Sequence, residues 1–190
     1  MKIGVLALQG AFREHAEALT ALGADVALVK RPEHLDSVDA IVLPGGESTT
    51  IDKLLDSSAL RAPLTRRMRE GLPAFATCAG LILCATEVID GRADQSPLGL
   101  LDVTVRRNGY GRQRESFEAP LAIRGLSDGD FPGVFIRAPV VERVGPDIEV
   151  LAVCDGIPVL GRAGDLWFGS FHPELSGDLR LHQLFVNEVC

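Results

Sequence analysis

Short apolar runs recur through the first half of the chain. Each run is nearly continuous rather than alternating, which is the pattern of a strand that is covered on both faces. The runs that we interpret as strands are 3–8, 25–29, 40–43 and 74–77. The first of them ends at Gln9-Gly10 and the third at Pro44, where a chain turns readily.

Helical spacing fills the intervals between these runs. The apolar positions of the first helix are Phe12, Ala16, Leu19 and Leu22. Gly23 can end that helix, a second is expected to start at a Ser48 or Thr49 cap and run through Leu55, and a third covers 60–69. After the last run, the apolar positions that predict one face of a fourth helix are Leu81, Ile82 and Ala85. Strands that alternate with helices predict an α/β fold, with an open, mainly parallel sheet and helices on both faces.

The second half of the chain changes character, because short extended segments separated by turns replace this alternation. The segments that we interpret as extra strands are 101–105, 117–123, 133–136, 150–153, 158–160 and 166–170. A closing helix is expected from about Asp178, and its inward-facing residues are Leu181, Leu184, Phe185 and Val189. No internal repeat and no long linker interrupts the sequence, so one domain over residues 1–190 is the economical interpretation.

The composition argues against several classes of protein. Hydrophobic residues make up 46% and charged residues 24%, as in soluble globular proteins, and the net charge of −7 without a basic run argues against nucleic acid. No apolar stretch is long enough to cross a membrane, and the N-terminal run is too short for a signal peptide. The four cysteines, which are Cys78, Cys84, Cys154 and Cys190, show no CxxC spacing, so a reducing, cytoplasmic setting fits best.

A cysteine stands where the strand 74–77 meets the fourth helix. Cys78 is flanked by small residues, as in a nucleophile elbow with sulfur in place of oxygen. The helix that follows would point N–H groups at the sulfur and favour the thiolate, and the N–H of Ala79 could stabilise an oxyanion. This segment alone does not decide between a reactive thiol and a buried structural one.

The pair His172 and Glu174 follows the expected strand 166–170. The carboxyl ends of parallel strands form one edge of a sheet, so His172 and Cys78 are expected at the same edge. Pro173 stiffens the link to Glu174, whose carboxylate could orient the imidazole and stabilise its cation. A stray histidine in a surface turn would be the ordinary interpretation of a His-Pro pair, but beside a cysteine elbow it is the weaker one.

A glycine-rich turn ends the strand 40–43. Gly45-Gly46 lets the backbone approach a ligand closely, and the N–H of Gly46 could complete an oxyanion hole with that of Ala79. Glu47 and Ser48 could meet the polar end of an amino-acid substrate. A turn capped by Ser48 is the alternative, whereas a phosphate loop is disfavoured because no lysine follows in the required frame.

In this order, the three segments resemble the class I, triad-type glutamine amidotransferases, which have a flavodoxin-like fold. Within that family the chain is similar to the branch of glutaminases that serve pyridoxal 5′-phosphate synthase, and the likeness covers nearly the whole chain. The segments that carry it are 4–10, 13–15, 30–32, 44–50, 77–81, 107–108, 111–113, 116–118, 135–139 and 170–175. Ala76 departs from the family, which usually has glycine there, but alanine is the smallest change and we expect the elbow to survive.

The resemblance implies a role for each matched residue. Cys78 matches the nucleophile, His172 the general base and acid, and Glu174 the third member of the triad. The residues that match substrate-binding positions are Gly46, Glu47, Ser48, Arg107 beside Asn108, Ile136 and Arg137. No metal or organic cofactor is implied, and His15, His34 and His182 show no ligand spacing with the cysteines, so we interpret them as structural or exposed.

The resemblance also implies a partner. The family hydrolyses L-glutamine and passes the ammonia to a separate (β/α)₈-barrel subunit that builds pyridoxal 5′-phosphate, so a hetero-oligomer is expected. At neutral pH free ammonia is mostly ammonium, which is not nucleophilic, and a sheltered transfer is therefore needed. We expect the edge with Gln9-Gly10, Gly45-Gly46 and the elbow to face this partner.

Three other functions compete with this one. A glutaminase that serves another acceptor, such as one in histidine biosynthesis, would share the triad, although Leu8-Gln9-Gly10 and the segment 135–139 argue against it. A related cysteine hydrolase or chaperone-like protein of similar fold usually places the carboxylate or the histidine differently. A non-catalytic binding subunit of the same fold would have no need for an intact triad.

Overall fold

The computed structural model describes residues 1–107, 109–110 and 116–189, so Asn108, the segment 111–115 and Cys190 lie outside the described residues. The helices are α1 Phe12–Ala21, α2 Ser48–Ser57, α3 Arg61–Arg69, α4 Ala79–Cys84 and α5 Arg180–Val189, with short 3₁₀ turns η1 Pro32–Ser37 and η2 Pro173–Leu175. The strands are β1 Lys2–Leu6, β2 Asp25–Val29, β3 Ala40–Leu43, β4 Ala74–Thr77, β5 Ala85–Ile89, β6 Leu101–Arg106, β7 Ser116–Leu121, β8 Phe131–Ile136, β9 Val140–Val144, β10 Glu149–Cys154, β11 Ile157–Ala163 and β12 Leu166–Gly169.

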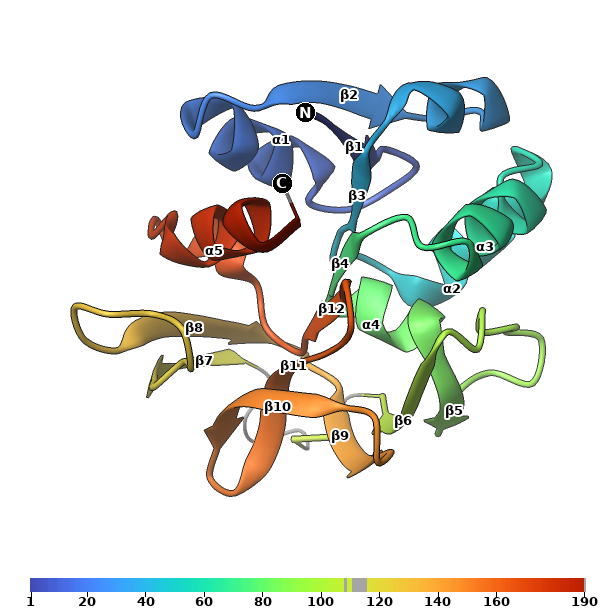
Figure 1. Ribbon diagram of the computed structural model, residues 1–190. Coiled ribbons are helices and arrows are strands. Elements are labelled where there is room, and N and C mark those ends of the chain that lie inside the picture. Colours follow the sequence, from blue (N-terminus) through green and yellow to red (C-terminus); the bar gives the residue numbers. More distant parts are fainter. Residues whose placement is uncertain (108, 111–115, 190) are drawn as a thin grey trace.

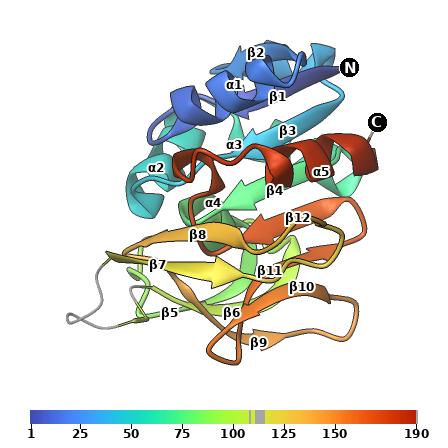
Figure 2. The same cartoon turned by 90° about the vertical axis from the view of Figure 1, so that its left-hand side faces the viewer.

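A seven-stranded sheet with the order β10-β11-β12-β4-β3-β1-β2 runs through the molecule (Figure 2). The five strands from β12 to β2 are parallel, whereas β10 and β11 are antiparallel to their neighbours. The α/β class predicted from the alternating apolar runs is therefore confirmed. Three predicted strands, 25–29, 40–43 and 74–77, coincide with β2, β3 and β4.

Helices cover both faces of this sheet, with α1 and α5 on one face and α2, α3 and α4 on the other (Figure 1). The strand β3 shows why, because its side chains alternate between two separate cores. Ile41 and Leu43 belong to the core under α2, α3 and α4, while Ala40 and Val42 belong to the core under α1 and α5. Continuous apolar runs were thus the correct sign of strands buried on both faces.

The second half of the chain supplies the antiparallel extension and two small sheets. The order β5-β6-β9 makes a three-stranded sheet, and β7 pairs with β8. The strand β9 was not predicted, because the charged pair Glu142-Arg143 interrupts its apolar pattern, although both side chains are engaged across the sheet by Arg106 and Asp102. The closing helix was predicted, and Leu181 and Phe185 are fully buried in it.

The fourth helix is shorter than its apolar spacing predicted. Ala85 was expected on its face but is extended and begins β5. The reason is that an incoming segment takes the last carbonyl groups of the helix, since the N–H groups of Leu98 and Leu100 donate to the carbonyls of Leu83 and Cys84 at 2.7 and 2.8 Å. Those carbonyls are satisfied without a further helical turn.

Candidate active site

Four loops meet at the carboxyl edge of the parallel strands. Gln9 follows β1, Gly45-Gly46 follows β3, Cys78 follows β4 and His172 follows β12. Because β12, β4, β3 and β1 are neighbours in the sheet, these loops are neighbours too. The sequence predicted that all four would share one edge, and the sheet order confirms it.

The backbone at Cys78 forms the predicted turn between strand and helix. Its φ of 46° and ψ of −100° lie outside the regions that side chains ordinarily allow, and such strain is typical of functional sites. Gly80 makes the turn possible, since a Cβ atom there would collide with the carbonyl oxygen of Leu43. Ala76, where glycine was the usual residue, is fully buried and leaves the elbow intact.

Cys78, His172 and Glu174 form a buried line of polar groups. His172 hydrogen-bonds Cys78, and its Nδ1 lies 2.7 Å from Oε1 of Glu174. Cys78 is 6% exposed and His172 7%, while the Glu174 side chain is completely covered. Burial works against a charged imidazole, but the hydrogen bonds with Cys78 and Glu174 raise the pKa of His172 to about 10. The arrangement therefore favours an imidazolium beside the sulfur of Cys78.

The glycine-rich loop lies directly against this line. A Cβ atom on Gly45 would collide with the imidazole of His172 and would come within 3.3 Å of Cβ of Cys78, so only glycine lets the loop pass. Gln9 holds the loop from the other side, because its Oε1 accepts the backbone N–H of Glu47 at 2.8 Å. Sequence reasoning assigned Gln9 no role within the site.

Glu47, and not Ser48 or Thr49 as predicted, caps α2. Its carboxylate accepts the backbone N–H groups of Thr49 and Thr50 at 3.3 and 2.8 Å, together with both threonine hydroxyls. Burial alone would raise the pKa of Glu47, but these hydrogen bonds lower it to about 2. Arg107 also reaches this carboxylate, with Nη2 3.2 Å from Oε1. The cap was misassigned because serine and threonine are the commoner capping residues.

A cavity of about 260 Å³ opens beside the thiol. Its lining residues are Gln9, Gly46, Glu47, Ser48, Cys78, Ile82, Arg107, Ile136, Arg137 and His172. All six residues that the resemblance matched to substrate binding are among them. Arg137, like Cys78, has a positive φ, of 43°. The hydroxyl of Ser48 is buried and has no hydrogen-bond partner among the described residues, so it is available to a ligand.

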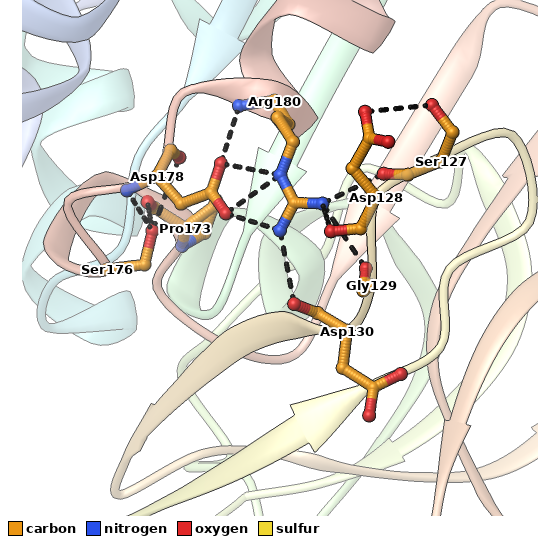
Figure 3. Close-up of polar contacts among 8 residues, drawn as sticks. All are labelled: Ser127, Asp128, Gly129, Asp130, Pro173, Ser176, Asp178 and Arg180. Atoms are coloured by element: carbon orange, nitrogen blue, oxygen red, sulfur yellow. Dashed lines mark hydrogen bonds and ion pairs between the residues drawn. The ribbon is translucent and has the colours of Figure 1, made fainter.

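Glu174 sits on η2, and the segment that follows this turn is fixed to the rest of the fold by Arg180. The guanidinium of Arg180 is held by both carboxylate oxygens of Asp178 and by the backbone carbonyls of residues 127–130 (Figure 3). Ser176 ties the start of the turn, since its hydroxyl donates to the carbonyl of Pro173 at 2.8 Å. The backbone N–H of His172 donates to the carbonyl of Val134 on β8, also at 2.8 Å. The segment that carries His172 and Glu174 is thus held to the fold both before and after the turn.

Two of the histidines that looked unconnected lie behind Glu174. His15 and His182 are completely buried, and Nε2 of His15 lies 3.3 Å from Oε2 of Glu174. Helical periodicity is the signal that could have placed His15, because it stands three and four residues before the buried Ala18 and Leu19 on α1. Its partners come from distant parts of the sequence and carry no local pattern.

Over residues 1–107, 109–110 and 116–189, no group of three or more histidine, cysteine or acidic side chains is arranged to hold a metal ion. Within the same ranges, no helix has both the length and the apolar character that crossing a bilayer requires.

Comparison with known sequences places the chain among close relatives. The profile of the "SNO glutamine amidotransferase family" matches residues 5–190. A protein of Mycobacteroides abscessus named "Pyridoxal 5'-phosphate synthase subunit PdxT" is 54% identical over 187 residues, which cover 98% of this chain and 96% of the relative. A protein of the same name from Salinispora arenicola is 52% identical over 192 residues, with the same coverage of both chains.

Comparison with solved structures leads to the same family. A structure described as "Crystal structure of glutamine amidotransferase" superposes with a TM-score of 0.92 at 49% identity and covers 98% of both chains. A more distant one, "Structure of PurLQS from Thermotoga maritima", superposes with a TM-score of 0.67 at 16% identity and covers 100% of this chain and 98% of that one. The second likeness supports the fold alone.

Proposed function

The chain belongs to the SNO glutamine amidotransferase family, and on that premise we propose that it is the glutaminase subunit of a pyridoxal 5′-phosphate synthase. It hydrolyses L-glutamine to L-glutamate and ammonia and delivers the ammonia to the synthase subunit. The observation that carries this proposal is the strained Cys78, hydrogen-bonded to an imidazole that Glu174 holds at 2.7 Å. A thiolate, a proton donor and an orienting carboxylate are the groups that amide hydrolysis through a thioester requires.

The first half of the reaction forms the thioester. The Cys78 thiolate attacks the side-chain amide carbon of glutamine, and the N–H groups of Gly46 and Ala79 stabilise the negative oxygen that develops. The His172 imidazolium gives its proton to the amide nitrogen, so the carbon–nitrogen bond breaks and ammonia leaves. The acyl group stays on sulfur.

The second half regenerates the thiolate. Neutral His172 takes a proton from water, and the resulting hydroxide attacks the thioester carbon. The carbon–sulfur bond breaks, glutamate is released, and the proton on His172 restores the original ion pair. Glu174 stabilises the imidazolium in both halves, as a carboxylate does in other triads.

The remaining cavity residues bind the amino-acid end of glutamine. Arg107 and Arg137 supply positive charge for its carboxylate, and the free buried hydroxyl of Ser48 supplies a hydrogen bond. Glu47 lies at the same wall, and its carboxylate can attract the ammonium group while it caps α2. Ile136 covers the aliphatic part of the substrate.

The partner is the synthase subunit, a (β/α)₈ barrel in our proposal, and the two form a hetero-oligomer in the cytoplasm, where the thiol stays reduced. Residues 1–190 act as one amidotransferase domain. The edge with Gln9, Gly45-Gly46 and the elbow faces the barrel, and docking orders the oxyanion hole. Equal glutaminase rates with and without the synthase subunit would contradict this ordering.

The deciding experiment mixes the purified chain with its cognate synthase subunit and supplies glutamine labelled with ¹⁵N in the side-chain amide. We expect glutamate to form and the label to enter pyridoxal 5′-phosphate. The Cys78→Ala complex should make the product from an ammonium salt but not from glutamine. Wild-type complex that releases no glutamate, or a Cys78→Ala complex that does, would refute the proposal.

A further inference from the structure

A chain of buried polar groups continues behind the triad. Nδ1 of His15 lies 2.9 Å from Nε2 of His182, and Nε2 of His15 lies 3.0 Å from the hydroxyl of Thr77 and 3.3 Å from Oε2 of Glu174. Thr77 is the residue before the nucleophile. His15 comes from α1 and His182 from α5, which cover the same face of the sheet (Figure 1), so these two helices contact each other through the two rings.

Oε2 of Glu174, the oxygen that faces His15, is buried and makes no hydrogen bond of ordinary geometry with another described residue. Oε1, by contrast, accepts from Nδ1 of His172. A carboxylate oxygen that is buried without a donor is costly, so the nearby Nε2 of His15 is the group that compensates it.

The proton positions along this chain follow from the acceptor at its end. An ionised carboxylate can only accept, so Nε2 of His15 must carry the proton that lies between Glu174 and Thr77. Burial lowers the pKa of His15, which therefore stays neutral, and its Nδ1 is left as an acceptor. Nε2 of His182 must then donate to it. In agreement, Nδ1 of His182 is buried without any hydrogen-bond partner among the described residues, as suits a bare lone pair.

We propose that His15 is a positioning residue for the reaction, acting through Glu174, and that His182 fixes the tautomer in which it acts. This inference rests on the proposed glutaminase function. His15 offers an N–H to the outer oxygen of Glu174 and to Thr77, and so holds the carboxylate in the plane in which it meets His172. Because His15 is neutral, it orients Glu174 without competing with His172 for its negative charge.

Neutrality is the feature that distinguishes this arrangement from an ordinary salt bridge. A lysine or arginine in the same place would pair with Glu174 and weaken its attraction for the imidazolium. The titratable groups around His15 are Glu14 on α1, His182 on α5, and Glu174 and His172 near the turn η2, with Cys78 beyond them. Burial lowers the pKa of His182 to about 3, so this ring is neutral as well.

The first test needs no substitution. Long-range ¹H–¹⁵N spectra of the wild-type protein, labelled at histidine, report the tautomer of each ring. We expect both His15 and His182 to carry their proton on Nε2 at neutral pH. A proton on Nδ1 of either ring, or a charged ring, would overturn the proposal, whatever the enzyme does with glutamine.

The second test compares His15→Gln with His15→Asn. A glutamine amide nitrogen can reach the place of Nε2, whereas that of asparagine reaches only the place of Nδ1. We expect kcat for glutamine with the synthase subunit to fall about tenfold or more in His15→Asn and to stay within about threefold of wild type in His15→Gln. KM should change little in both. His34→Gln, at a histidine outside the site, is the control and should leave the rate unchanged.

A readout that does not depend on glutaminase activity separates positioning from packing. The rate at which iodoacetamide alkylates Cys78 is measured against pH on the peptide that contains this residue, and Cys84→Ala is used as the background so that Cys78 is the only thiol in that peptide. In His15→Asn the acid limb of this profile should move to higher pH, because a loose Glu174 stabilises the imidazolium less. His15→Gln should keep the wild-type limb.

An acid limb that is unchanged or moves down in His15→Asn would reduce His15 to a packing residue and overturn the proposal. Thermal unfolding of both variants shows whether each is folded, and if His15→Asn does not fold, the tautomer spectra still decide. Failure of the proposed function looks different, since the wild-type complex would then release no glutamate while the tautomers and the alkylation profile would be as described.

Discussion

Cys78 stands just before α4 and Cys84 at its end, and the surroundings of the two thiols differ. Cys78 precedes the helix on a strained backbone, borders the cavity and is hydrogen-bonded to His172. Cys84 ends the helix inside the core under α2, α3 and α4, and burial raises the pKa of its thiol to about 12. Yet the exposed fractions of the two residues are 6% and 0%. Exposure therefore does not separate the thiol that we propose as the nucleophile from the thiol in the core.

The difference lies in what surrounds each sulfur. At Cys78 the sheet edge supplies an imidazole, a carboxylate behind it and a loop that only glycine allows so close. At Cys84 the neighbours are apolar, and a thiolate would have no compensating charge. The reactivity of a buried cysteine is thus set by the partners that the fold brings to it.

Exchanging each cysteine for alanine should give the largest contrast. We expect Cys78→Ala to lower glutaminase kcat by roughly 10⁴-fold or more, because the nucleophile is lost. Cys84→Ala should keep the wild-type rate but lower the free energy of unfolding by about 1 kcal/mol, because it leaves a small cavity. Glutamate release measures the fall in kcat, labelling by a glutamine-analogue electrophile identifies the nucleophile, and denaturant unfolding measures the change in stability. Labelling that survives in Cys78→Ala would remove the basis of the comparison.

Weakening the partners of Cys78 without touching the thiol sharpens the contrast. We expect Glu174→Gln to lower kcat by roughly 10²- to 10⁴-fold, because the amide carries no charge for the imidazolium and can present an N–H to Nδ1 of His172. Steady-state glutamate release measures this. Glu70→Gln, at the exposed residue that follows the last turn of α3, is the matched control and should behave as wild type. A Glu174→Gln enzyme with normal kcat would mean that Cys78 needs only its histidine.

The two ends should also differ in their response to pH. The pKa of His172 is raised from 6.5 to about 10, so the stability that its cation contributes is fully present below pH 6.5 and is lost as pH rises through about 10. The difference in free energy of unfolding between wild type and His172→Asn should therefore shrink across this window. Urea unfolding at several pH values measures it, with Cys84→Ala as the variant whose difference from wild type should stay constant between pH 6 and 8. A difference that grows with pH would contradict the charged imidazole.

The smallest effect is expected at the loop that borders Cys78. Glu47→Ala should lower the free energy of unfolding by about 1 kcal/mol, the usual cost of losing a helix cap, and should weaken glutamine binding. The pKa of Glu47 is lowered to about 2, so its capping contribution is present above about pH 4.5 and is lost as pH falls toward 2. Unfolding curves at pH 7 and pH 3 test both statements. Glu47→Asp, which keeps a carboxylate one methylene shorter, should recover part of the loss.

Sequence reasoning reached those parts of the molecule that have a local pattern. The apolar runs located β2, β3 and β4, and the order of strands and helices located the edge that holds Cys78 and His172. It missed β9, whose charged residues are paired across a small sheet, and it gave Ala85 to a helix that ends early because Leu98 and Leu100 take its carbonyls. Both misses depend on contacts between distant segments.

The site shows the same division. The triad lies in two short motifs, so it could be proposed from the sequence, while the resemblance supplied glutamine and the synthase. The Glu47 cap was missed because two better capping residues follow it, and His15 was missed because its partners Thr77, Glu174 and His182 come from three other segments. A helical wheel could have shown that His15 is buried, but not what it touches.

The place of β12 beside β4 also has a consequence for how the protein is made. The chain is synthesised from its N-terminus, so β4, the strand that precedes Cys78, leaves the ribosome well before β12. These two strands pair in the folded protein although nearly half of the chain separates them. Until β12 docks, the cysteine has neither histidine nor glutamate beside it. If Cys78 is the nucleophile, as we propose, a nascent or prematurely terminated chain that lacks β12 should be inactive, and the site is completed only in the last stage of synthesis.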